Sequence, residues 1–419
     1  MDESAGWDEA GCSHPVDEMS DCALEEKAVL PFARSEYLQR IANVKRRMDA
    51  AGVDVLLISD PCNMNYLTGY DATSYYVHQM IALALDAEEP LWIGRQMDVA
   101  CARFTTFLDG DNLRGYPESY IGVPDRHAME FVALELRERG WDRGRIGVEM
   151  DAHFFTARCY QELRTHLPDA DFVDATLLVN WVRIVKSPQE IAYMRQAGAI
   201  AERAMNVAID AITVGVRQCD AAAAIYAATV GGTAEFGGDM PEAPWMPSGE
   251  RTSAPHLTWT DERYKPGEAT NVELSGVRHR YTTALARTVI LGDPAPKLKT
   301  MIPVAIDGLN AALDRARPGV TGHDVEAAWR EIAAANGIEK SSRIGYSIGI
   351  GYPGPSWNER TASLQPGDTT VLEPNMTFHM IIGLWMDDWG FELSETLRVT
   401  DDGAPEVFSH VPREVFVKG

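Results

Sequence analysis

The 419-residue sequence lacks paired cysteines, a long apolar run and an excess of positive charge. Its six cysteines are scattered with no CxxC spacing, which argues against a zinc ribbon or a disulfide framework, and we interpret them as buried or idle thiols. No stretch approaches the roughly 18 apolar residues of a membrane-spanning helix. The acidic start, MDESAGWDEAG, lacks the basic-then-apolar order of a secretory signal. We therefore expect a cytoplasmic protein.

Acidic residues clearly outnumber basic ones. The 62 Asp and Glu against 38 Lys and Arg give a formal net charge of −24. An acidic surface repels nucleic acids and anionic membranes, so neither is an expected partner. The length exceeds the size at which one hydrophobic core keeps growing, so we expect two domains.

The first part of the chain alternates helical and strand-like segments after an acidic start. Residues 1–33 contain nine Asp or Glu and no apolar periodicity, which predicts a mobile acidic tail. A helix is predicted over 35–51 and a buried strand over 53–59. These segments indicate an α/β domain over residues 34–180. Further strand-like runs and one helix complete it, at 80–86, 89–94, 145–150, 170–176 and 127–140.

A second domain, residues 181–419, is predicted to begin around WVRIVKSPQE at 181–190. Ser187 is suited to cap a helix, Pro188 fits the first turn, and Glu190 occupies the reciprocal capping-box position. A long helix is therefore predicted over 191–212. Further helical stretches and strands rich in Thr, Val and Ile follow it.

Four segments of this second domain combine apolar strands with glycine or proline turns and polar groups at strand ends, where sites are usually built. They span 248–259, 271–289, 343–364 and 372–400. Together with RIVKSPQEI before them, their order and spacing resemble the pita-bread family of methionine aminopeptidase, prolidase and creatinase. The resemblance implies an α/β N-terminal domain followed by an α+β pita-bread catalytic domain.

The resemblance also implies that a two-ion metal site has been lost. Metal-dependent members hold two ions with Asp, Asp, His, Glu and Glu, and the matching positions here are Glu273, Ala284, Tyr346, Ile381 and Ser394. A pair of divalent cations needs several oxygen or imidazole donors, and alanine and isoleucine offer none. We therefore expect no metal and no cofactor.

Within the family, Glu273, YSIG at 346–349, the loop at 357–360 and FELSE at 391–395 resemble the ectoine hydrolase branch. That resemblance implies ring opening of ectoine, a cyclic amidinium bearing a carboxylate, to an N-acetylated 2,4-diaminobutyrate. Hydroxyectoine is a second candidate substrate. We expect Glu273 to attack the cationic carbon between the two nitrogens, because a carboxylate is attracted to it. His256, at the position of the creatinase histidine, is the expected acid and base, since imidazoles exchange protons near neutral pH.

The substrate cation also needs a binding pocket. Aromatic faces attract cations by roughly 0.5–2 kcal/mol each, and Arg360 is the expected clamp for the substrate carboxylate. In the family a partner's N-terminal domain caps the pocket, which implies a homodimer in which Asn65, Tyr70 and Tyr75 reach the neighbouring site. The aromatic candidates within the four segments are Trp259, Tyr346, Tyr352, Trp357, Trp385, Trp389 and Phe391.

Structural roles compete with these functional ones. Strand aromatics usually pack in the core, so only about two or three of the seven are expected to touch substrate. A buried carboxylate such as Glu273 is rarely idle unless paired, and Arg287 is the alternative partner. His379 is expected to be a core or supporting histidine. Structural roles are also expected for Glu359, Glu373 and Glu395.

Two other functions remain open from the sequence. One is creatinase-like hydrolysis of another guanidino or amidino acid. The other is a catalytically inactive pita-bread module used for binding, and the pairing of Glu273 with His256 argues against it.

Overall fold

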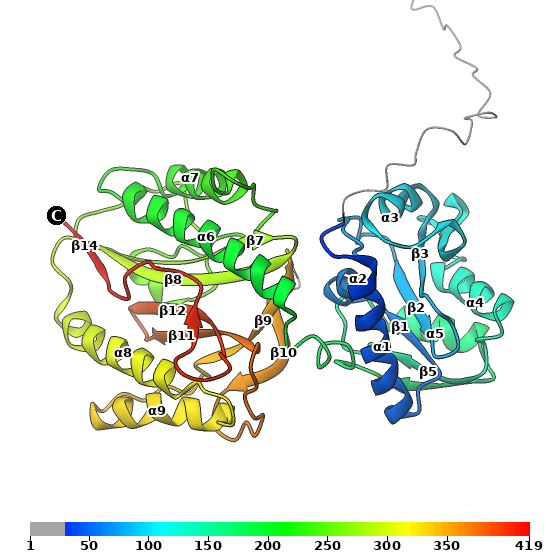
Figure 1. The fold of residues 1–419 in the computed structure, drawn as a ribbon. Helices are drawn as coiled ribbons and strands as arrows, with labels where there is room; N and C mark the ends of the chain where they lie inside the picture. Colours follow the sequence, from blue (N-terminus) through cyan, green and yellow to red (C-terminus); the bar gives the residue numbers. More distant parts are fainter. Residues whose placement is uncertain (1–29, 355) are drawn as a thin grey trace, which may run out of the picture.

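The computed structural model describes residues 30–354 and 356–419, arranged as two domains side by side (Figure 1). Residues 1–29 of the predicted acidic tail lie outside the described residues. The end of the predicted tail packs onto the protein, because Phe32 is buried and its ring contacts those of Tyr37 and Tyr281. No described helix is both long and apolar enough to cross a membrane.

The N-terminal domain is a mixed sheet covered on both faces by helices. Within the described residues its strand order is β4-β3-β2-β1-β5-β6. Alternate residues of β1 face opposite ways: Leu56 and Ile58 pack with α1 and α2, while Val55 and Leu57 pack with α4 and α5. Both faces are therefore buried, as expected for an α/β domain. The strands are β1 Val55–Ile58, β2 Met80–Ala84, β3 Leu91–Arg95, β4 Leu113–Tyr116, β5 Gly144–Val148 and β6 Ala170–Asp174. The helices are α1 Arg34–Ala51, α2 Pro61–Thr68, η1 Gln96–Asp98, α3 Val99–Thr105, η2 Gly110–Asn112, η3 Glu118–Tyr120, α4 Ala128–Glu138 and α5 Ala157–His166.

The C-terminal domain is a curved sheet held between two pairs of helices. Its described strands run β13-β12-β11-β9-β8-β14, with β7 paired to β8 and β10 to β9. Helices α6 and α7 cover one face, and α8 and α9 cover the other (Figure 1). The strands are β7 Ala269–Arg278, β8 Tyr281–Leu291, β9 Gly345–Tyr352, β10 Ser356–Leu364, β11 Thr377–Trp385, β12 Gly390–Arg398, β13 Glu406–Val407 and β14 Phe416–Lys418. The helices are α6 Pro188–Ala211, α7 Gln218–Gly231, η4 Gly249–Ser253, α8 Pro296–Arg315 and α9 Gly322–Ala335. The prediction of an α/β domain followed by an α+β domain is confirmed.

The start of α6 is set by the capping box predicted from the sequence. The Ser187 hydroxyl accepts from Glu190 N at 3.2 Å, and the Glu190 carboxylate accepts from Ser187 N at 2.7 Å. Farther along, α6 lies directly on β7 at Gly276, where a Cβ atom would come within 2.0 Å of Ala197 O. Only glycine permits this approach, so the helix fixes the position of β7.

A buried polar network joins the two domains. Tyr281 Oη donates to Glu190 Oε1 at 2.7 Å, and the Arg40 guanidinium from α1 lies 3.7 Å from the same carboxylate. Within the C-terminal domain, Lys186 and Glu359 form a buried ion pair at 2.6 Å. Because buried charges are costly unless paired, the contact of Arg40 with Glu190 helps to hold the domains in one arrangement.

Candidate active site

One face of the C-terminal sheet gathers several of the polar residues singled out in the sequence. Glu273 of β7 lies opposite Ala286 of β8, and Ser275 lies opposite Ala284. Directly opposed residues point to the same face of a sheet. The two alanines occupy little volume there, so side chains from the neighbouring strands extend towards the Glu273 carboxyl group.

Glu273 is buried, with 4% of its surface exposed. On the free edge of β7 its backbone pairs with Trp245, through hydrogen bonds of 2.9 and 3.0 Å. Its Oε1 atom lies 3.8 Å from Nδ1 of His379. Burial, and secondarily the charge of Glu392, raises the pKa of Glu273 well above its usual value. Removal from water thus favours the neutral acid until a cation arrives.

A hydrogen-bonded chain runs beside this carboxyl group. Trp357 Nε1 donates to Tyr346 Oη at 3.0 Å, Tyr346 Oη lies 3.1 Å from His379 Nδ1, and His379 Nε2 lies 2.8 Å from Ser394 Oγ. Burial lowers the pKa of His379 to about 3, so its imidazole is neutral. A consistent assignment has Tyr346 donating to Nδ1 and Nε2–H donating to Ser394. These hydrogen bonds hold the Tyr346 ring in place.

A second buried carboxyl group, Glu392 of β12, borders the site. Its Oε1 accepts from Trp385 Nε1 at 2.8 Å. Burial raises the pKa of Glu392 to about 7, although this hydrogen bond and the Lys340 charge oppose the rise. Burial also lowers the pKa of Lys340 to about 8. Burial thus shifts the pKa values of four titratable groups in this region, which is a common property of active sites. They are Glu273, His379, Glu392 and Lys340.

Two of the three carboxylates that the sequence assigned to structural roles, Glu395 and Glu359, form buried ion pairs. Arg287, the alternative partner of Glu273, pairs instead with Glu395 at 2.7 Å, and its side chain leaves the strand on the opposite face. Glu359 pairs with Lys186, and Glu373 is exposed. Glu273 therefore has no Lys or Arg partner among the described residues.

His256 lies at the outer edge of this arrangement. It is exposed, and its ring meets that of Trp245 edge-on, with 5.4 Å between centroids. Trp245 in turn contacts Trp357 at 5.1 Å. Among the described residues no direct contact joins His256 to Glu273, so Trp245 lies between the expected base and the expected nucleophile.

Two further aromatic candidates lie away from Glu273. The Trp259 ring packs against Tyr226, with 5.9 Å between centroids. Trp389 is partly buried against the core between the sheet and α8 and α9. The structure does not bring either ring into contact with Tyr346 or His379.

Phe391 is buried in the core between the sheet and helices α8 and α9, whereas Tyr352, Tyr70, Tyr75 and Asn65 lie at the domain junction. Tyr352 Oη donates to Tyr70 O at 3.1 Å, and its ring meets that of Tyr75 edge-on at 6.0 Å. Asn65 is buried and donates to the main-chain oxygens of Gly69 and Tyr70 after α2. Between this junction and Glu273 lies a cavity of about 10 Å³, lined by residues that include Ser275, Thr282, Tyr352 and Trp357. It has room for about one water molecule.

Arg360, the expected carboxylate clamp, points to the N-terminal domain. Its guanidinium donates to Asp151 O at 3.0 Å and pairs with the Asp151 carboxylate. Its φ of 60° falls where the pairing of β10 with β9 shifts register. The structure therefore brings Glu273, Tyr346 and Trp357 together but holds Arg360 elsewhere.

The side chains at the family's ligand positions do not fit a pair of metal ions. Ala284 and Ile381 carry no donor atom, and Tyr346 and Ser394 present only hydroxyl groups, already used by His379. Glu273 is the one carboxylate of the five. Two divalent cations need more anionic oxygen or imidazole donors than this.

Sequence reasoning missed two residues of the site and undervalued a third. Trp245 lies outside the four strand segments, although Pro247 favours extended backbone at the neighbouring Met246. Glu392 gave no separate signal. His379 was expected to be a core or supporting histidine, and the alternation of side chains along β11 could have placed it with Ile381 on the Glu273 face.

Comparisons with known proteins identify both domains. Residues 192–401 match the model of metallopeptidase family M24, and residues 40–185 match the creatinase/prolidase N-terminal domain. An uncharacterised hydrolase/peptidase of Sinorhizobium fredii is 46% identical, over 93% of this chain and 99% of its own length. An ectoine hydrolase of Halomonas elongata is 43% identical, over 93% of this chain and 99% of its own length.

Solved structures share the two-domain fold. A prolidase from Thermococcus sibiricus superposes with a TM-score of 0.79 at 16% identity, covering 91% of this chain and 99% of that one. The dipeptidase PepE from Mycobacterium ulcerans gives 0.77 at 23% identity, covering 92% and 99%. At this identity the likeness establishes the fold, and it confirms the expected pita-bread domain.

Proposed function

The chain belongs to metallopeptidase family M24 and carries the creatinase/prolidase N-terminal domain, and from that premise we propose that this hydrolase opens the ring of ectoine. The 43% identity to an ectoine hydrolase along nearly the whole chain supports the substrate. The main physical support is a buried carboxyl group, Glu273, with no Lys or Arg partner among the described residues and with aromatic rings around it.

The charge of the substrate explains why Glu273 is unpaired. In the free protein burial holds the pKa of this group well above its usual value. A bound amidinium cation supplies the missing positive charge and favours the carboxylate. Trp245, Trp357 and Tyr346 offer aromatic faces to the same cation. Substrate binding therefore creates the nucleophile.

The proposed reaction proceeds through a covalent intermediate on Glu273. The carboxylate oxygen bonds to the amidinium carbon, giving a tetrahedral adduct. One ring C–N bond breaks as a proton passes to the departing nitrogen, which leaves an acyl-imidate on Glu273. Water then bonds to the same carbon, the bond to the glutamate oxygen breaks, and the amide of an N-acetylated 2,4-diaminobutyrate forms. Overall, ectoine and one water molecule give one N-acetylated 2,4-diaminobutyrate, and Glu273 is regenerated.

We assign proton transfer to His256 rather than to His379. Burial lowers the pKa of His379 to about 3, so this residue is not an imidazolium at neutral pH, and its one N–H is assigned to the hydrogen bond with Ser394. His256 is exposed, at the outer edge of the site beside Trp245. Tyr346, oriented by His379, is positioned to hydrogen-bond the reacting centre.

Binding requires rearrangement of the pocket. The cavity of about 10 Å³ beside Trp357 is too small for ectoine, so lining side chains must move. We keep Arg360 as the substrate clamp, which requires that it leave Asp151. We also propose a homodimer in which the partner's N-terminal domain closes the site, with Asn65, Tyr70 and Tyr75 as the capping candidates.

The proposal includes catalysis without a metal, and one experiment tests both parts. Purified protein, treated with a chelator and desalted, is incubated separately with ectoine, hydroxyectoine and creatine, and products are identified by mass spectrometry. We expect acetylated diaminobutyrate from ectoine and no urea from creatine. Glu273→Gln and His256→Ala should abolish or strongly reduce turnover, while the exposed controls Glu250→Gln and His153→Ala should match the wild type. Undiminished turnover by Glu273→Gln, or consumption of creatine but not ectoine, refutes the proposal.

A further inference from the structure

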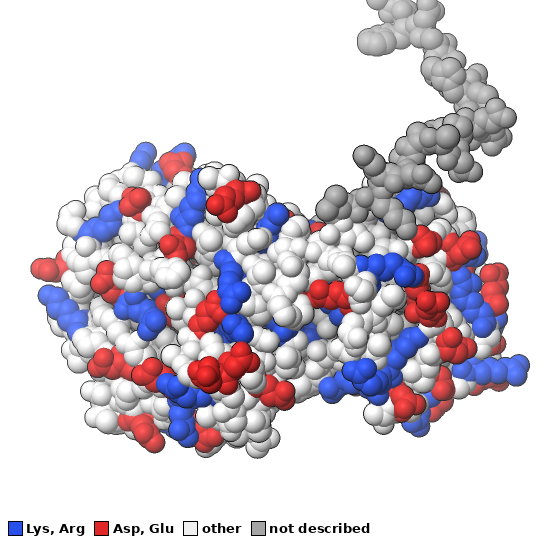
Figure 2. Space-filling view, in the orientation of Figure 1, with Lys and Arg blue, Asp and Glu red and all other residues white. Residues whose placement is uncertain are grey.

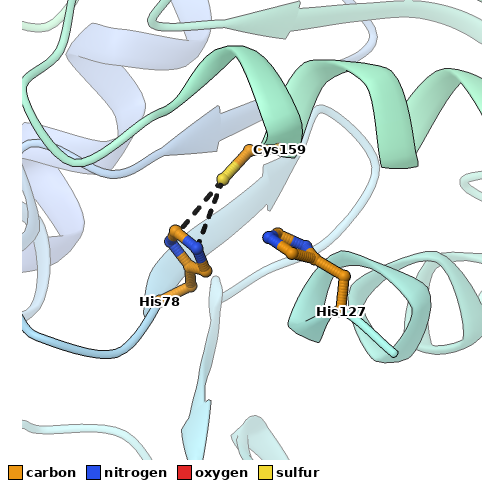
Figure 3. Close-up of side chains that lie close together, drawn as sticks. All are labelled: His78, His127 and Cys159. Atoms are coloured by element: carbon orange, nitrogen blue, oxygen red, sulfur yellow. Dashed lines mark hydrogen bonds between the residues drawn. The ribbon is translucent and has the colours of Figure 1, made fainter. Parts of the chain in front are cut away.

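Far from Glu273, three metal-ligating side chains meet in the N-terminal domain. His78 lies just before β2, His127 caps the start of α4, and Cys159 lies in the first turn of α5 (Figure 3). Their ligand atoms all lie within 4.8 Å of one another, which no other group of three His, Cys, Asp or Glu achieves among the described residues. The side chains come from three separate segments and point towards a common centre (Figure 3).

The spacing is close to that of a tetrahedral zinc site. Zinc–sulfur and zinc–nitrogen bonds of about 2.3 and 2.0–2.1 Å place a thiolate and an imidazole nitrogen roughly 3.6 Å apart. Cys159 Sγ lies 3.5 Å from Nδ1 and 3.8 Å from Nε2 of His78. The two imidazole rings are 4.8 Å apart between centroids. A movement of His127 by about 1 Å would complete the set.

The surroundings orient these side chains. His78 makes a hydrogen bond to the main chain of Phe154, the kind of contact that fixes the ring of a metal-bound histidine. His127 Nδ1 accepts from Met129 N at 3.3 Å as a helix cap, which leaves Nε2 for a metal. Binding there moves the ring proton to Nδ1 and gives up the hydrogen bond that caps the helix, which the new bond from Nε2 to the metal replaces.

Catalysis by the thiol is a poorer explanation of the cluster. Burial raises the pKa of Cys159, whereas nucleophilic cysteines have a lowered pKa. Two imidazoles and one thiolate are donors for zinc rather than for calcium or magnesium, which take oxygen ligands.

We propose that His78, His127 and Cys159 bind one zinc ion, with water as the fourth ligand. Three protein ligands and one open position are a common zinc arrangement. The ion ties the loop before β2 to the starts of α4 and α5. This site lies in the other domain from Glu273 and takes no part in the proposed hydrolysis.

The test is direct metal binding by the full-length chain. Chelator-treated protein is titrated with zinc against a chromophoric competitor, and with cobalt(II) as a spectroscopic probe. We expect one zinc per chain and a thiolate-to-cobalt charge-transfer band. Cys159→Ser should remove the band, and both Cys159→Ser and His127→Asn should weaken zinc binding at least about 100-fold. Asparagine keeps the helix cap, so His127→Asn tests the imidazole alone if the serine variant fails to fold.

Cys101→Ser is the matched control, because Cys101 is a partly buried cysteine of the same domain on α3. It should bind zinc as the wild type does. If His127→Asn binds zinc as tightly as the wild type, or if the cobalt complex of the wild type shows no thiolate band, the site does not exist.

Discussion

Replacing Glu392 with glutamine should stabilise the protein, and more so at alkaline pH. Burial raises the pKa of Glu392 from 4.5 to about 7. A carboxyl group with a raised folded-state pKa favours the folded state at low pH and opposes it as the pH rises through that value. Each unit of difference between the folded and unfolded pKa values corresponds to about 1.36 kcal/mol. The raised pKa of Glu392 therefore lowers the free energy of unfolding by about 3 kcal/mol at pH 8 and by under about 1 kcal/mol at pH 5. Glutamine keeps an acceptor for Trp385 without the charge. Glu392→Gln should therefore raise the free energy of unfolding by about 2–3 kcal/mol at pH 8.

Urea denaturation at pH 5 and pH 8 measures this difference. Glu395→Gln is the matched control, because Glu395 lies on the same strand, faces the other way and pairs with Arg287 at 2.7 Å. Leaving that buried arginine unpaired should cost about 3–5 kcal/mol. The two Glu→Gln substitutions, three residues apart, should thus change the free energy of unfolding in opposite directions. A loss of stability in Glu392→Gln at pH 8, or an equal gain at both pH values, would refute the reasoning.

Three further predictions concern Glu273, the neighbouring Tyr346 and the buried ion pair of Lys186 and Glu359. Because the pKa of Glu273 is raised, kcat/KM for ectoine should rise with pH as this carboxyl group ionises. Glu392→Gln removes a neighbouring negative charge and should move this rise to lower pH. A pH–rate profile that Glu392→Gln leaves unchanged would contradict the coupling between the two carboxyl groups. Tyr346→Phe removes the hydroxyl that links two buried groups and should lower kcat/KM about 10- to 100-fold in steady-state assays, whereas wild-type rates would remove Tyr346 from the mechanism. Glu359→Gln leaves Lys186 buried and unpaired and should cost about 3–5 kcal/mol in urea denaturation; a change below about 1 kcal/mol would mean that the pair is solvated.

Local sequence patterns were enough to locate several of the helices and strands. The capping box of Ser187 and Glu190, with Pro188 between them, located the start of α6 because these signals act within one helical turn. Glu273 was singled out because it matches a ligand position of the family, and its place in a strand expected to be buried then favoured a functional role.

Contacts between distant segments could not be read in the same way. Trp245 reaches Glu273 through an isolated bridge at the free edge of β7, and no local pattern specifies that pairing. His379 meets Tyr346 only because β11 and β9 pair in one register. Arg360 is drawn to Asp151 in the other domain, a contact that depends on how the two domains pack. Register and domain packing are set by the whole core, so side-chain periodicity alone does not reveal them.

Trapping the intermediate tests the central claim most directly. The chain is mixed with ectoine, quenched with acid during turnover and digested, and the β7 peptide is examined by mass spectrometry. The proposed mechanism predicts a mass increase of one ectoine on Glu273, absent from Glu273→Gln. Turnover of ectoine with no adduct on this peptide, and with undiminished rate in Glu273→Gln, would contradict it.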